Sequence, residues 1–310
     1  MGGGLPTVNA HDAFHINASS AGLVDNNRFI NCSSTSYGYI FGRDDTSWGW
    51  AEAFGSAGSF VFFEDNEFSQ NDPAGNHAIY MSYGYAAVIR CNKFTYTGSG
   101  RWYDAVDAHG YGHGTGRRGG RMWEIYGNYF DTKHSGRHIF LRAGSGRVYA
   151  NRFANSASIE LFEYRVCTTA AYAYPVTTND YSTNSALSSG STPSCIGSEG
   201  YPCCDQIGRI RDGGTRQIGD IAYFLDNRTS GGSDVLAITD GTAHNAFCVP
   251  NGIDETSYIR SGREYYNTQA PGYAPYQYPH PARGLAASTT CLSGENSKAN
   301  TGITFFRTVP

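Results

Sequence analysis

Four residues in the middle of the chain have side chains suited to acid–base chemistry on a sugar: Asp107, His109, Arg142 and Glu160. A glycoside hydrolase needs a proton donor and a second carboxylate, which Asp107 and Glu160 could supply. A polysaccharide lyase needs a cation beside a uronate carboxylate and a base for the α proton, which Arg142 and His109 could supply. Because these residues lie far apart in the sequence, either chemistry depends on the fold that brings them together.

The stretch HGYGHGTGRRGGR, residues 109–121, holds six glycines, two histidines and three arginines. Its segment GTGRRG matches the GxGxxG pattern of dinucleotide-binding proteins, but that motif must open a helix. The strand-like run WEIYGNYF follows instead, so we interpret the stretch as an exposed basic loop. His109 and His113 have no third ligand at a matching spacing, so we predict no metal site and no cofactor, with calcium left open.

Composition narrows the class of partner. The chain has 310 residues, of which 16% are charged, 14% are aromatic and 39 are glycine, and its formal net charge is -4. A mildly negative charge gives no reason to expect binding to nucleic acid or to an anionic membrane. No run of about 18 apolar residues is present, so we expect no membrane span. This polar, aromatic, glycine-rich profile is typical of extracellular β-rich proteins.

The cysteines indicate disulfides, since none of them has the CxxC spacing of a metal site. Disulfides persist mainly in oxidising compartments, so we expect the protein outside the cell or at the cell surface. Their pairing cannot be read from the sequence, and reduced thiols remain an alternative. The eight are Cys32, Cys91, Cys167, Cys195, Cys203, Cys204, Cys248 and Cys291.

A repeated phrase organises the first half of the chain. It has an apolar or aromatic lead, then asparagine, one variable residue and phenylalanine, and it recurs every 23 to 39 residues. Variable periods of this length are typical of solenoids, in which extra residues form loops between coils. The repeated asparagine is expected to be a turn residue and the phenylalanine a core residue. The phrases are VDNNRF (24–29), FEDNEF (63–68), IRCNKF (89–94), IYGNYF (125–130) and VYANRF (148–153).

A second series of short strand-like runs lies between these phrases: YGYIFG (37–42), HAIYMS (77–82), AVDAH (105–109), HIFLR (138–142) and IELFE (159–163). Two interleaved strand families without amphipathic helices indicate an all-β parallel β-helix, in which equivalent residues stack about 4.8 Å apart. We predict one domain over residues 1–310: regular coils at 1–166, a Cys/Ser/Thr-rich loop insertion at 167–205, and irregular final coils with an extended tail at 206–310.

Side-chain alternation places the candidate residues on one wall of this solenoid. If Val106, Ile139 and Ile159 face inward, then Asp107 and Glu160 face outward on the same side, two coils or about 9 to 10 Å apart. This is the upper edge of the separation in inverting hydrolases. Asp107 and Arg142 could also form only a surface ion pair, worth about 0 to 1 kcal/mol. The residues expected to contact a substrate are Tyr80, His113, Arg117, Lys133, His138, Phe140 and Phe162.

The chain resembles the secreted right-handed parallel β-helix repeat proteins of the pectin-lyase-like superfamily. The resemblance covers nearly the whole chain and rests on the repeated phrases, on VDAHGYGHG before RMWEIYGNYF, and on GYPCCDQIGR, REYYN and PYQYPHP. It implies a right-handed winding and makes action on a polysaccharide plausible. The chain departs from the family pattern because no N-terminal capping helix precedes DAFHI, and an uncapped coil would favour self-association.

Two classes of function follow from these patterns. The first is an extracellular carbohydrate-active protein that cleaves a polysaccharide, with β-elimination slightly favoured over hydrolysis because the 109–121 loop is basic. The second is a non-catalytic surface, phage-type or assembly-forming β-helix that binds glycan or self-associates. A further pair, Glu64 and Arg90, is expected to form a structural salt bridge between neighbouring coils.

Overall fold

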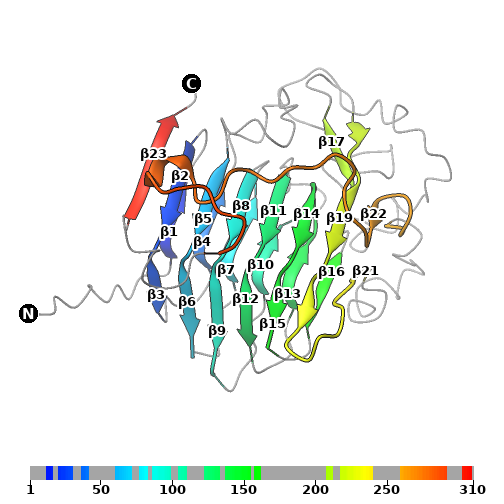
Figure 1. Ribbon diagram of the computed structural model, residues 1–310, viewed down its shortest axis with the longest axis horizontal. Coiled ribbons are helices and arrows are strands. Elements are labelled where there is room, and N and C mark those ends of the chain that lie inside the picture. The colour runs from blue at the N-terminus through cyan, green and yellow to red at the C-terminus, as the bar shows by residue number, and fades with distance from the viewer. Residues whose placement is uncertain are drawn as a thin grey trace, which may run out of the picture.

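The computed structural model of the protein is built from three stacks of strands (Figure 1). The residues that it describes are 12–16, 20–30, 36–41, 60–71, 77–82, 86–98, 104–109, 122–132, 137–154, 157–161, 207–211, 217–239, 259–291 and 302–308.

Each coil of the chain adds one strand to each of three sheets, and neighbouring coils pair in parallel. The first sheet has the order β1 (Asp12–Ile16), β4 (Ser36–Phe41), β7 (His77–Ser82), β10 (Asp104–Ala108), β13 (Arg137–Leu141), β16 (Ile159–Leu161) and β21 (Ala237–Thr239). The second has the order β22 (Tyr265–Tyr266), β19 (Ala222–Leu225), β14 (Ser145–Tyr149), β11 (Met122–Tyr126), β8 (Ala86–Arg90), β5 (Val61–Glu64), β2 (Ser20–Asp25) and β23 (Gly302–Thr308). The third has the order β20 (Arg228–Thr229), β15 (Arg152–Phe153), β12 (Tyr129–Thr132), β9 (Lys93–Tyr96), β6 (Glu67–Gln70) and β3 (Arg28–Ile30).

Two smaller elements complete the described fold. β17 (Arg209–Arg211) and β18 (Gln217–Gly219) form an antiparallel hairpin, and Pro281–Arg283 form a 3-10 turn. The prediction of an all-β solenoid of stacked parallel strands is therefore confirmed. The predicted loop insertion at 167–205 lies outside the described residues.

The repeated asparagine forms a continuous ladder at the turn between the second and third sheets. The residue before it adopts a left-handed backbone with φ between 51° and 63° in six successive coils. This bend aims the asparagine inward, where each amide Nδ2 donates to the Oδ1 of the next asparagine at 2.9 to 3.1 Å. The ladder holds Asn27, Asn66, Asn92, Asn128, Asn151 and Asn227, so the expected turn role is confirmed for the five predicted members and extends to a sixth.

The repeated phenylalanines stack face to face inside the solenoid. Neighbouring ring centroids from Phe29 through Phe68, Phe94 and Phe130 to Phe153 lie 4.8 to 5.0 Å apart, with interplanar angles of 7° to 13°. The spacing equals that of the strands, because a side chain repeated at one register position must repeat with the backbone. The predicted core role of these residues is confirmed.

The last strand of the chain returns to the first coil. β23 pairs antiparallel with β2, so it occupies the edge of the second sheet that the N-terminal coil would otherwise expose. Paired edges cannot recruit another strand. β23 is in turn the terminal strand of the second sheet, as β1 and β3 are of the other two, and self-association through this end of the solenoid stays a prediction.

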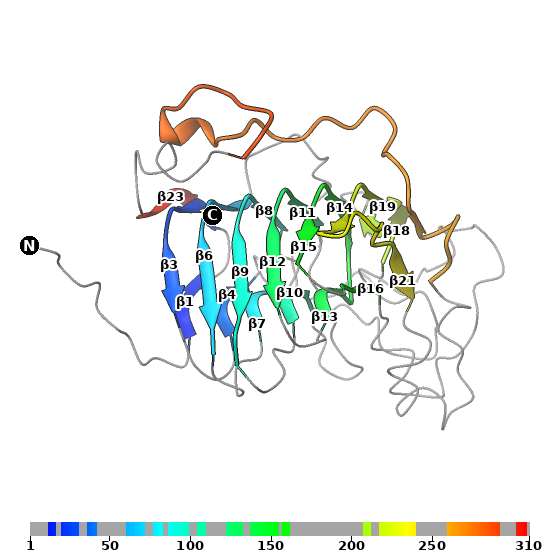
Figure 2. The same ribbon diagram turned by 60° about the horizontal axis from the view of Figure 1, so that its bottom comes forward.

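Residues 270–291, here called the strap, lie across the outer face of the second sheet (Figure 2). Beneath the strap, Arg90 Nε donates to Glu64 Oε1 at 2.7 Å, and both side chains are fully buried, so the predicted salt bridge is confirmed. From the strap, Arg283 contacts Asp65 and lies 3.5 Å from Glu64 Oε2. The disulfide Cys91–Cys291 joins the end of the strap to the turn after β8.

Candidate functional site

The register of the first sheet brings the candidate residues into one column. Tyr80 of β7 pairs with Asp107 of β10, Asp107 with Phe140 of β13, and Phe140 with Glu160 of β16. Alternate neighbours such as Ile79, Val106 and Ile139 belong to the core. The column is therefore at the outer side of the sheet, as the alternation of the sequence predicts.

A second outward column lies beside the first, and the sequence pattern did not predict it. On β10, both Ala105 and Val106 are in the core, so the outward positions are Asp104 and Asp107, three residues apart. His77 and Arg137 both pair with Asp104, so they belong to the second column. Each therefore lies three residues before a member of the first column, Tyr80 or Phe140. The sequence does contain a sign of this second column: two neighbouring strands each have two consecutive apolar residues, AI at 78–79 and AV at 105–106.

We call this combined surface the outer wall. It comprises His77, Tyr80, Asp104, Asp107, His109, Arg137, Phe140, Arg142 and Glu160.

Arginines of β13 and the residue after it neutralise both aspartates of the wall. Arg142 forms a two-point ion pair with Asp107, with Nε 3.1 Å from Oδ1. Arg137 Nε donates to Asp104 Oδ1 at 2.8 Å and lies 4.0 Å from Glu160 Oε2. Burial alone would lower the pKa of Arg142, but the charge and hydrogen bonds of Asp107, together with the charge of Asp104, raise this pKa, so the guanidinium stays charged.

Aromatic rings separate these charged groups. The guanidinium carbons of Arg137 and Arg142 lie 3.8 and 4.8 Å from the ring centroid of Phe140. The Tyr80 ring lies 4.7 Å from that of His109 and 5.2 Å from that of His77. His109 is fixed by its backbone, whose amide donates to the Met81 carbonyl at 2.8 Å. The wall therefore combines fixed cations with aromatic rings, of which Phe140 and Tyr80 are only 2% and 6% exposed.

The two carboxylates proposed for hydrolysis differ in accessibility. Asp107 is fully buried and both of its oxygens accept from Arg142, whereas the Glu160 side chain is 13% exposed. A carboxylate that is closed to solvent, with both oxygens bonded to an arginine, has no oxygen in position to reach a glycosidic bond. The geometry thus fits Arg142, oriented by Asp107, better than it fits Asp107 as a catalytic acid.

The sequence pattern places His138 on the outer wall, but in the structure it lies inside the solenoid. Its ring contacts Phe130 and Phe153 edge-on, at centroid distances of 6.1 and 5.3 Å, and its Nδ1 accepts from the Ser158 amide at 3.3 Å. Burial lowers the pKa of His138 to about 4, so the ring is neutral. His138 faces inward because it aligns with Ala105, the extra inward residue of β10.

One group of wall residues has donor atoms close enough for a metal ion. His77 Nδ1 lies 3.3 Å from Asp104 Oδ2 and 3.7 Å from Asp107 Oδ2. The donor types suit a divalent ion, but each carboxylate already accepts from an arginine that compensates its charge. We therefore assign these three residues to the polar network of the wall and derive no metal chemistry from them.

Several predicted substrate contacts lie outside the described residues. These are His113, Arg117, Lys133 and Phe162.

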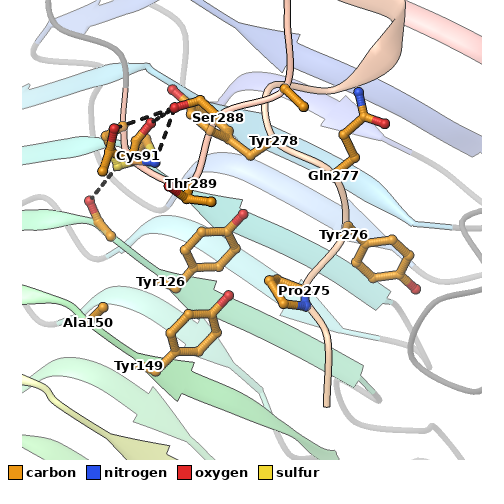
Figure 3. Close-up of a pocket in the computed structure, with 14 residues that line it drawn as sticks. Cys91, Tyr126, Tyr149, Ala150, Pro275, Tyr276, Gln277, Tyr278, Ser288 and Thr289 are labelled. Carbon is orange, nitrogen blue, oxygen red and sulfur yellow. Dashed lines mark hydrogen bonds between the residues drawn. A yellow bond between two sulfur atoms is a disulfide. The ribbon is translucent and has the colours of Figure 1, made fainter. Parts of the chain in front are cut away.

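A separate cavity of about 840 Å³ opens between the second sheet and the strap (Figure 3). Its floor holds the stacked rings of Tyr126 and Tyr149, whose centroids are 4.6 Å apart. Its other side is formed by strap residues 275–278 and 287–291. No local sequence pattern indicates this cavity, because its two sides are more than 120 residues apart along the chain.

Comparisons with known proteins add no family to this geometry: no protein-family profile matches the chain, and neither a curated protein nor a solved structure shows significant similarity to it. Among the residues that the structure describes, none forms a helix with the length and hydropathy of a membrane span.

Proposed function

We propose that the protein binds an acidic polysaccharide along the outer wall and cleaves it by β-elimination. The observation that supports this most is the row in which Phe140 lies between the guanidinium groups of Arg137 and Arg142, beside the Tyr80–His109 ring pair. Aromatic faces take the apolar side of a pyranose, and arginines take the carboxylate of a uronate. Arg137 and Arg142 are already paired with Asp104 and Asp107, so a bound uronate carboxylate would share these guanidinium groups with the two aspartates.

In the proposed reaction, Arg142 binds the uronate carboxylate and stabilises the negative charge that develops on it. Asp107 accepts from two guanidinium N–H groups of Arg142 and so fixes the orientation of the guanidinium plane. His109 removes the proton α to the carboxylate, the electron pair forms a carbon–carbon double bond, and the glycosidic C–O bond at the β carbon breaks. The leaving oxygen takes a proton from water, which yields one unsaturated and one free chain end, and His109 releases the proton that it removed to the solvent.

We also propose that the solenoid is right-handed, that the protein belongs to the pectin-lyase-like superfamily and that it is extracellular. A right-handed winding, membership of the pectin-lyase-like superfamily and an extracellular location all accord with the parallel sheets, the asparagine ladder and the disulfide.

A non-catalytic glycan-binding protein is the second candidate. It is favoured by the burial of Asp104 and Asp107 and by their pairing with arginine, since buried ion-paired carboxylates hold the arginines in place and do not face a substrate. On this alternative, the wall holds a polyuronate but does not cleave it. Assembly through β1 and β3, the terminal strands of two sheets, would accompany such a role.

Turnover assays separate these candidates. The protein is incubated with polygalacturonate, alginate and a neutral glucan, while unsaturated products are followed by absorbance and new reducing ends by a colour reaction. Elimination predicts that both signals rise together on a polyuronate, that His109→Ala and Arg142→Lys lower the rate at least about 100-fold, and that Arg152→Ala on the third sheet has no effect. Reducing ends without unsaturated product would contradict elimination, and binding without turnover would establish the second candidate.

A further inference from the structure

We propose that the cavity under the strap is a second binding site, and that its ligand is a neutral sugar unit. The site lies on the outer face of the second sheet and shares no residue with the outer wall. Its volume of about 840 Å³ is within the range of ligand pockets, which is roughly 300 to 1,000 Å³. The proposal does not depend on the activity proposed for the wall.

The walls of the cavity are held in place without a ligand. The Cys91–Cys291 disulfide fixes one end of the strap, and Tyr278 donates to Asp65 at 2.8 Å near the other side. Gly127 makes room for this arrangement, because a Cβ there would lie 2.8 Å from the Cys291 sulfur. A preformed cavity loses little conformational entropy when a ligand enters.

The described residues that line the cavity carry no charge, which excludes an anionic ligand. Arg90 contacts the lining residue Tyr126, but all five of its N–H groups are already used. Nε and one Nη2 proton go to Glu64, the other Nη2 proton to the Gln277 carbonyl, and Nη1 donates to Tyr126 Oη and the Tyr276 carbonyl. A carboxylate or phosphate would lose its water without gaining a counter-charge.

The polar groups that remain are neutral hydroxyls beside aromatic rings. Tyr126 Oη accepts from Arg90 at 2.9 Å, and its own proton is left to donate. Burial raises the pKa of Tyr126, so the phenol stays protonated. Ser288, Thr289 and Thr290 add hydroxyls at the strap side, where Thr289 is exposed (Figure 3). The stacked pair Tyr126–Tyr149 gives the cavity an apolar lining and the strap adds hydroxyls, a combination that suits a pyranose, which has apolar C–H groups and a polar rim.

The test is isothermal titration of the full chain with neutral hexasaccharides, cellohexaose, xylohexaose and mannohexaose, and with trigalacturonate as the charged probe. Thr289→Trp should fill the mouth of the cavity and weaken binding of a neutral probe at least about tenfold, whereas Thr268→Trp, also at an exposed threonine, should not. Tyr126→Phe, which removes the proposed donor, should weaken the same binding if the tryptophan variant is poorly folded. Trigalacturonate affinity should be unchanged by Thr289→Trp.

Three outcomes would overturn this assignment. They are no measurable binding of any neutral probe, neutral binding that neither cavity variant affects, and neutral binding that is lost in Arg142→Lys, which would place it on the outer wall. Because trigalacturonate reports on the wall, a failure of the proposed function leaves a different pattern from a failure of the cavity site.

Discussion

At the scale of single residues, His138 is a histidine in the interior of the solenoid, where burial keeps its ring neutral. Alternation along HIFLR places it with Phe140 and Arg142, yet it packs against Phe130 and Phe153 in the core. Alternation predicted the Asp107–Phe140–Glu160 column correctly, because these residues come after the point at which two consecutive residues face inward. It could not predict His77 or Asp104, which precede that position.

The buried imidazole should make the protein less stable in acid. Burial lowers the pKa of His138 from 6.5 to about 4 on folding. The stability that the neutral ring contributes is therefore fully present above about pH 6.5 and is lost as the pH falls toward 4. Between pH 6.5 and 4, we expect His138 to lower the free energy of unfolding of the wild-type protein by on the order of 3 kcal/mol. His138→Gln should not show this part of the loss, because a glutamine side chain does not titrate. Urea unfolding of both proteins at several pH values, with pH 8 as reference, measures it. Parallel stability curves would contradict the assignment.

Among the elements, the asparagine ladder was predictable and its length was not. The phrase N-x-F marks five members, but Asn227 belongs to LDNRT, in which Thr229 pairs with Phe153 and replaces the phenylalanine. The left-handed residue before each asparagine is Asn, Asp, Cys, Gly or Ala, so no single residue type marks the bend. The ladder tolerates this variation because backbone and amide bonds, not that side chain, define the turn.

Removing one internal amide should cost more than removing the terminal one. Asn128 Oδ1 accepts from both the backbone and the side chain of Asn92, and its Nδ2 donates to Ile89 and Asn151. Asn128→Ala leaves several buried groups without partners, so we expect a loss of at least about 2 kcal/mol in the free energy of unfolding. Asn27→Ala, at the partly exposed end, should lose clearly less. Equal losses in chemical denaturation would mean that the ladder is not a stack of buried bonds.

At the scale of the whole molecule, the closure of the solenoid was beyond sequence reasoning. Repeats predict that neighbouring coils stack, since each coil offers its neighbour the same apolar face. Nothing local predicts that β23 pairs with β2, or that Cys291 bonds to Cys91, 200 residues away. Such contacts depend on where the last coil ends, which the irregular spacing of the later coils does not reveal.

The disulfide should contribute strongly to global stability, because it closes a 200-residue loop. The double variant Cys91→Ser/Cys291→Ser is expected to lose about 3 to 5 kcal/mol, mainly through a less restricted unfolded state. Denaturant unfolding of the variant and of the wild-type protein measures the difference. A loss below about 1 kcal/mol would show that the strap is held by its other contacts alone.

The most direct test of the account is the affinity of polygalacturonate fragments for the outer wall. Titration of the wild-type protein is compared with Arg137→Gln, Arg142→Lys and the control Arg152→Ala, whose arginine is exposed and paired with Asp226 on another side. Near-ultraviolet circular dichroism verifies that each variant is folded. We expect both wall variants to bind at least about tenfold more weakly and the control to bind as the wild type does. Equal affinity in all four proteins, or no binding by the wild type, would contradict the assignment of the wall as a site for acidic polysaccharide.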